Sequence, residues 1–128
     1  MIDKIIALRR ELHKYPELSK EETKTSSKIQ QFLTDLKVFE IYQITETGFV
    51  AVLDTMVEGP SVLVRAELDG LPIKEKTDLD YTSAFDGKAH SCGHDGHMAI
   101  VCGLAMKLAE NPPAKGMLYI ICPVMKRD

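Results

Sequence analysis

The sequence has little of what marks several common protein classes. It contains three cysteines, Cys92, Cys102 and Cys122, without a CxxC pair, which argues against a disulfide framework and for reduced thiols. Its net charge is −3 with acidic and basic residues interspersed, so no basic stripe exists to bind nucleic acid or an anionic membrane. No apolar run is long enough for a signal peptide or a membrane span, and we expect a cytoplasmic protein.

The composition is that of an ordinary globular domain. Hydrophobic residues make up 45% and charged residues 27% of the 128 positions, within the range of soluble proteins. We find no repeat, linker or low-complexity segment. A chain of this length forms one domain with a substantial core, although a complete catalytic apparatus usually needs more residues.

Two amphipathic helices are expected first. Residues 2–13 form one helix, which Pro16 ends because proline disfavours the helical conformation of its predecessor. Ser19 and Glu22 have the spacing of a capping box, and the helix that follows extends to about Leu36. The apolar faces expected for the two helices are Ile2, Ile5, Ile6 and Leu12, and then Ile29, Phe32, Leu33 and Leu36.

Strands and a third helix make up the rest of the pattern. Apolar or alternating stretches at residues 38–44, 48–53 and 61–66 predict three strands, separated by turn residues. Residues 94–110 are apolar almost all round, which is typical of a helix buried against a sheet. Residues 117–121 predict a further buried strand. Helices that alternate with strands indicate an α/β or α+β sheet domain.

Residues 90–97, HSCGHDGH, are the strongest candidates for chemistry. Thiolate and imidazole bind borderline-soft divalent ions, and the two glycines allow Cys92 and His94 to converge on one ion. Their position at a helix N-terminus favours the thiolate. Asp95 or His97 then orients a ligand from outside the coordination sphere. The alternative is a glycine-rich turn with solvated histidines, which we consider weaker because the residues are so concentrated.

Five other residues receive more modest interpretations. Cys102 and Cys122 lie in apolar runs, where a free cysteine behaves as a small hydrophobe. His13 is expected to be a helix-end residue rather than a ligand, because nothing near it in sequence supplies partners. Glu67 and Asp69, in the segment RAELDGLP after the third strand, could hold a metal ligand in orientation. Charged residues at a strand end are more often only a solvated edge.

Three motifs in order resemble the metal-dependent amidohydrolase family of hippurate hydrolases and N-acyl-L-amino acid amidohydrolases, which are aminoacylase-like metallopeptidases. They are residues 9–17 (RRELHKYPE), 65–72 (RAELDGLP) and 90–97. The resemblance implies a zinc-peptidase-like domain with helices on a mixed sheet, of which residues 1–128 form the N-terminal part. It also implies that Cys92 and His94 bind manganese or zinc near Asp69. Glu67 stands where relatives usually have aspartate.

The same resemblance implies metal-dependent hydrolysis of the amide bond in N-acyl amino acids or related amides. In such enzymes two divalent ions polarise the carbonyl and activate water, with a glutamate as general base. Relatives carry Gln-Pro-Ala-Glu-Glu where this chain ends in CPVMKRD, residues 122–128. We therefore expect a truncated or frameshifted chain, without the general base and the lid or dimerisation domain, and inactive alone.

Two other interpretations stay open. A small metal-binding module that associates with itself would suit a chain whose sheet edge and apolar surface are uncovered. A thiol redox protein that uses Cys92 is less favoured, since no resolving cysteine lies at motif spacing.

Overall fold

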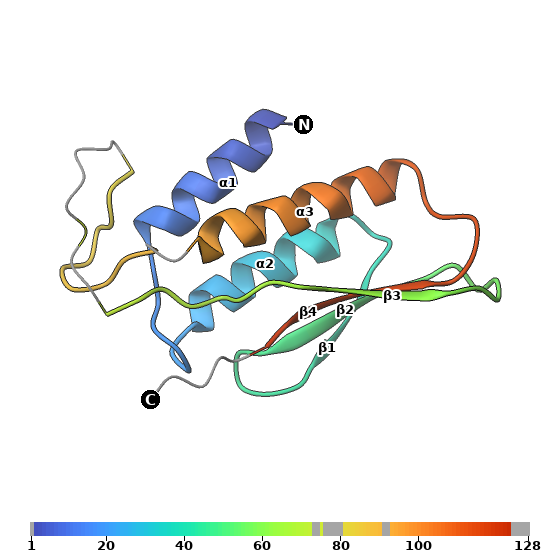
Figure 1. Ribbon diagram of the computed structural model, residues 1–128, viewed down its shortest axis with the longest axis horizontal. Coiled ribbons are helices and arrows are strands. Elements are labelled where there is room, and N and C mark those ends of the chain that lie inside the picture. The colour runs from blue at the N-terminus through green and yellow to red at the C-terminus, as the bar shows by residue number, and fades with distance from the viewer. Residues whose placement is uncertain (1, 73–74, 76–80, 91–92, 124–128) are drawn as a thin grey trace.

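A computed structural model describes residues 2–72, 75, 81–90 and 93–123. Within them the chain forms three helices and four strands (Figure 1). In chain order these are α1 (Ile2–Lys14), α2 (Thr23–Asp35), β1 (Glu40–Gln43), β2 (Phe49–Asp54), β3 (Ser61–Arg65), α3 (His94–Glu110) and β4 (Met117–Cys122). The elements expected from the sequence are all present, and the bounds of the strands agree within two residues.

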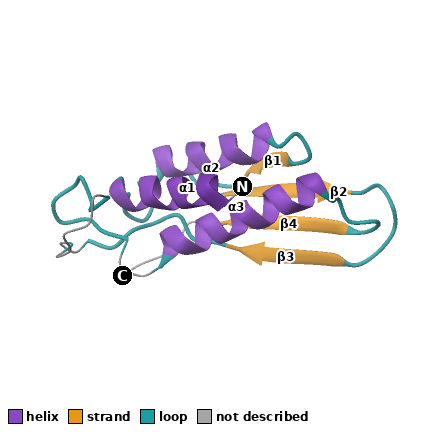
Figure 2. Ribbon diagram, turned by 90° about the horizontal axis from the view of Figure 1, so that it is seen from above, coloured by secondary structure: helices purple, strands orange, loops and turns teal. Residues whose placement is uncertain are grey.

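The four strands form one mixed sheet in the order β1-β2-β4-β3. The pairs β1/β2 and β2/β4 are antiparallel, whereas β3 and β4 are parallel. A parallel pair needs a long crossover connection, and α3 lies in that connection. All three helices lie on the same side of the sheet (Figure 1), and α3 crosses over β4 when seen from above (Figure 2). The expected fold class, helices packed on a mixed sheet, is confirmed.

The core lies between the sheet and the helices. Residues alternate along β2 and β4, so that one face of each strand is buried, as the two-residue period of a strand requires. Phe49 and Ile120 are fully buried on this face. They belong to one cluster with α2 and α3, whose fully or almost fully buried members are Ile29, Leu33, Met98, Cys102 and Ala105.

The capping box expected at Ser19 and Glu22 is wrong. Helix α2 begins at Thr23, and its N-cap residue, Glu22, makes no side-chain capping hydrogen bond. Instead the carboxylate of Glu17 accepts hydrogen bonds from the backbone amides of Lys24 at 3.3 Å and Thr25 at 2.5 Å. A carboxylate from the preceding turn thus satisfies amides that the helix itself cannot.

The burial expected for the helices at residues 2–13 (α1) and 94–110 (α3) needs correction. Ile2 and Ile6 of α1 are largely exposed, whereas Leu8 and Leu12 are buried, because α1 packs on α3 rather than on the sheet. Helix α3 is not buried all round, since the Ile100 side chain is 69% exposed. Among the described residues, no helix has the length and apolar character to cross a membrane.

Candidate metal site

The candidate site lies where β3 leads into the loop and α3 begins. Beyond Arg65 the chain continues through the buried residues Ala66 and Leu68 to Asp69, which is completely buried. Helix α3 starts at His94 and carries the chain back to β4, which pairs in parallel with β3. Asp69 and His94 therefore meet at the carboxyl end of a parallel strand, where open sheets commonly place ligand-binding groups.

The imidazole of His94 is oriented by Asp69. Its Nδ1 lies 2.9 Å from the backbone oxygen of Asp69 and 3.0 Å from the carboxylate Oδ1. A backbone carbonyl only accepts hydrogen bonds, so Nδ1 carries the hydrogen. In the neutral ring, Nε2 is then left with a free lone pair. An imidazole held by a carboxylate in this way is typical of a metal-binding histidine.

Glu67 lies on the Nε2 side of the same ring. Its Oε2 is 3.8 Å from His94 Nε2, a distance too long for a direct hydrogen bond. Its other oxygen, Oε1, accepts a hydrogen bond from Arg65 Nε at 3.0 Å. His94 Nε2 and Glu67 Oε2, two atoms that can each bind a metal ion, thus face each other without a direct hydrogen bond.

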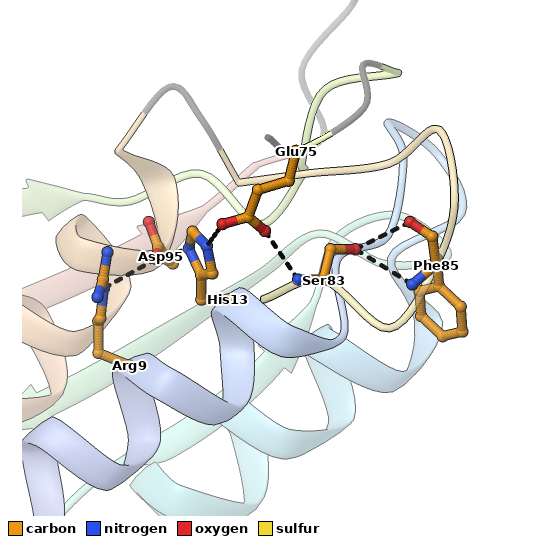
Figure 3. A network of polar contacts seen from close by, with 6 residues as sticks. All are labelled: Arg9, His13, Glu75, Ser83, Phe85 and Asp95. Atoms are coloured by element: carbon orange, nitrogen blue, oxygen red, sulfur yellow. Dashed lines mark hydrogen bonds and ion pairs between the residues drawn. The ribbon is translucent and has the colours of Figure 1, made fainter. Parts of the chain in front are cut away.

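Asp95, the next residue of α3, contacts α1 instead of the loop (Figure 3). Its Oδ2 accepts from Arg9 Nε at 2.9 Å and from His13 Nδ1 at 2.8 Å. His13 Nε2 lies 2.7 Å from Oε2 of Glu75. His13 lies in the last turn of α1, as expected, and its partners come from residues 62 and 82 positions away in sequence.

The Glu75 carboxylate also organises the segment that follows it. Its second oxygen, Oε1, accepts a hydrogen bond from the backbone amide of Ser83 at 2.7 Å. The Ser83 hydroxyl in turn donates to the backbone oxygen of Phe85 and accepts from the Phe85 amide (Figure 3). No local sequence signal marks Glu75 for this role, since its contacts depend on tertiary structure.

His90 is a second histidine that sequence reasoning left without a role. It is 3% exposed, and neither ring nitrogen has a hydrogen-bond partner among the described residues. Burial lowers its pKa to about 4; Asp95 opposes this shift, and His13 adds to it. The His90 ring is consequently neutral at pH 7.

Cys92 and His97 are the remaining candidates from residues 90–97. Cys92 lies outside the described residues, so its approach to His94 stays a prediction. His97 is exposed, with its ring centroid 6.1 Å from that of His94. In the part of the chain that the structure describes, no three or more His, Cys, Asp or Glu residues form a group that could hold a metal ion.

The two remaining cysteines behave as small hydrophobic residues, as expected. Cys102 and Cys122 are free and buried, and burial raises the pKa of each thiol to about 12. At neutral pH both are protonated, which excludes them as thiolate nucleophiles or ready metal ligands.

Comparisons with known proteins agree on one family. Residues 63–122 match Peptidase family M20/M25/M40. An N-acetylcysteine deacetylase from Bacillus subtilis is 40% identical over 109 residues, which are 84% of this chain and 28% of that protein. An N-acetyldiaminopimelate deacetylase from a Geobacillus species is 37% identical over 123 residues, 95% of this chain and 33% of that protein.

A solved structure extends the likeness to the fold. The Bacillus subtilis YXEP protein, described as a dinuclear metal-binding peptidase of the M20 family, superposes with a TM-score of 0.89 at 38% identity. The match covers 97% of this chain and 35% of that one. The chain thus spans about a third of the length of these relatives.

Proposed function

Because the chain belongs to the peptidase M20 family, we propose that it is part of a metal-dependent amidohydrolase that cleaves the amide bond of N-acyl amino acids. The single observation that carries this proposal is the His94 ring, whose Nδ1 is held by Asp69 so that Nε2 is available to a metal ion. The deacetylase relatives act on N-acetylated amino acids, which supports the same substrate class here.

The proposed ligands are Cys92 and His94, with Asp69 orienting the histidine and with Asp95 and His97 outside the coordination sphere. The donors suit manganese or zinc, since imidazole and thiolate bind borderline-soft divalent ions. In a complete enzyme we propose two such ions, which would polarise the amide carbonyl and activate water. The part played by these residues is to present donor atoms in a fixed direction.

Residues 1–128 alone are proposed to be catalytically inactive. The described residues include no candidate general base beside His94 Nε2 apart from Glu67, which is already paired with Arg65. We propose that these residues are the N-terminal part of the catalytic domain, and that the base, the remaining ligands and a lid or dimerisation domain belong to segments found in longer relatives. A cytoplasmic location is proposed on the reduced state of the thiols.

Metal titration tests the proposed ligands directly. The 128-residue chain should bind Co²⁺, as a spectroscopic substitute for zinc, weakly and with a thiolate-to-metal absorption band, because two-ligand sites hold metal poorly. His94→Gln and Cys92→Ala should abolish the band. Cys102→Ala is the matched control for loss of a thiol and should retain it. A band that persists in both ligand variants would refute the assignment.

An activity assay tests the second part of the proposal. N-acetylcysteine and N-acetyldiaminopimelate, incubated with the chain and either Mn²⁺ or Zn²⁺, should release no acetate above the rate of the His94→Gln variant. Metal-dependent turnover by the 128-residue chain would show that the inactivity assignment is wrong while leaving the proposed reaction intact.

A small self-associating module is the second candidate. It is favoured by β3, a sheet-edge strand on which Val62 and Leu63 are 55% and 60% exposed, since unpaired apolar edges promote strand pairing between chains. Sedimentation of the chain over a range of concentrations separates the two: a monomer at all concentrations removes this candidate.

A further inference from the structure

We infer that His13 is a positioning residue for the proposed metal site, acting through Asp95 to set the direction in which His94 presents Nε2. The inference rests on the proposed function, because it concerns the histidine assigned as a metal ligand. Neither the family match nor the named relatives assign a role to this residue. The contacts that carry it are drawn in Figure 3.

The first turn of α3 is held from two directions. His94 is bonded to Asp69 in the loop after β3, while Asp95 is bonded to His13 on α1. Adjacent residues on a helix project about 100° apart. Two anchors at that angle fix both the rotation of the helix end and its distance from the loop, which a single anchor leaves free.

The bridge through His13 is buried from end to end. The side chains of His13, Asp95 and Glu75 are 7%, 2% and 5% exposed. Water cannot readily replace any of these partners, and hydrogen bonds between charged groups are stronger and shorter than neutral ones. Both contacts of the ring are hydrogen bonds only when each nitrogen carries a hydrogen, since ionised carboxylates only accept.

Arg9 provides a weaker second contact to the same oxygen of Asp95. Its side chain is 37% exposed, with Nε 2.9 Å from Asp95 Oδ2 and its guanidinium carbon 5.2 Å from the centre of the Tyr81 ring. An exposed ion pair is screened by water and salt and contributes little. His13 is therefore the principal link between α1 and the first turn of α3.

Two substitutions test the two hydrogen bonds of His13 separately. In His13→Asn the amide nitrogen takes the place of Nδ1 and can still donate to Asp95. In His13→Gln the amide nitrogen takes the place of Nε2, so the bond to Glu75 is kept and the bond to Asp95 is lost. The two variants are similar in polarity and differ in which carboxylate they reach.

The first readout needs no metal. Two-bond hydrogen–nitrogen NMR correlations report the tautomer of each imidazole, and the chain has four histidines. In the unaltered chain His94 should show a protonated Nδ1 and an unprotonated Nε2. His13→Asn should preserve that pattern. In His13→Gln the two His94 nitrogen shifts should move toward each other, as expected for a ring that exchanges between tautomers.

The second readout is Co²⁺ affinity. Loss of a partner that orients a metal ligand typically weakens binding about 10- to 100-fold, and we expect a loss of that size for His13→Gln. The loss for His13→Asn should be below about tenfold. Leu8→Ala, which loosens α1 without touching Asp95, is the control for destabilisation and should leave the His94 shifts unchanged.

Each outcome decides the inference. Unchanged His94 shifts in His13→Gln, or equal effects of the Asn and Gln variants, would show that His13 only stabilises the fold. If both variants fail to fold, Asp95→Ala, which removes the same link from the α3 side, should move the two His94 nitrogen shifts toward each other, and no shift there overturns the inference. If the unaltered chain binds no Co²⁺, the proposed function fails while the His94 shifts still test the positioning role.

Discussion

The His90 ring, which is buried and has no hydrogen-bond partner among the residues that the structure describes, predicts an acid-sensitive fold. Burial lowers its pKa from 6.5 to about 4, so between these values the unfolded chain binds a proton that the folded chain does not. Stability conferred by the neutral ring is complete above pH 6.5 and is lost as the pH falls toward 4. A shift of this size corresponds to roughly 3 kcal/mol at 1.36 kcal/mol per pH unit.

The variant His90→Leu should remove this dependence. Leucine fills a similar volume and cannot be protonated, so its free energy of unfolding should fall less on acidification than that of the unaltered chain. Urea unfolding at several pH values between 7.5 and 4.5, with a chelator present, gives the difference between the two chains. That difference should grow by roughly 2.5 kcal/mol in favour of the variant between pH 7.5 and 4.5, since the full effect is reached only below the folded pKa.

The control is His97→Leu, which removes an exposed imidazole in the first turn of α3 and should give a curve parallel to that of the unaltered chain. A difference between the unaltered chain and His90→Leu that stays constant across the pH range would refute the reasoning, because it would show that His90 titrates alike in both states.

Further predictions follow from other buried groups. Burial raises the pKa of Glu22, and Asp69 adds to this, so the folded state favours the protonated acid and loses stability as the pH rises past 4.5. Glu22→Gln should therefore stabilise the chain more at pH 7.5 than at pH 4.5 in urea unfolding. Asp69→Asn should weaken Co²⁺ binding about 10- to 100-fold, measured by spectroscopic titration. Iodoacetamide should leave Cys102 and Cys122 unmodified in the folded chain, as read by peptide mass spectrometry, since their thiols have pKa values of about 12. Alkylation of either without denaturant contradicts their burial.

The secondary structure was predictable because it follows from local patterns. The alternation of Phe49, Ala51 and Leu53 is a two-residue period, and the run from residue 94 to residue 110 gives α3 with the bounds observed. The sequence predictions were wrong where contacts with neighbouring segments determine helix capping and side-chain exposure. The start of α2 is capped by Glu17 rather than Ser19, and exposure along α1 depends on its packing against α3.

The candidate site was predictable only in part. Histidine and cysteine concentrated in residues 90–97 are visible in the sequence, whereas the burial of Asp69 beside His94 depends on how the loop after β3 folds back. From the sequence alone, a buried Asp69 that contacts His94 could not be distinguished from a carboxylate at a solvated strand edge.

The sequence by itself determined which residues are helical or extended and where the metal-binding types gather, since these are properties of short stretches of chain. Only the tertiary structure decided that His13 bridges Asp95 and Glu75 and that His94 offers Nε2. Contacts between residues 62 or 82 positions apart carry no periodic signal; they arise when packing of α1 on α3 brings the groups together and burial makes their pairing obligatory.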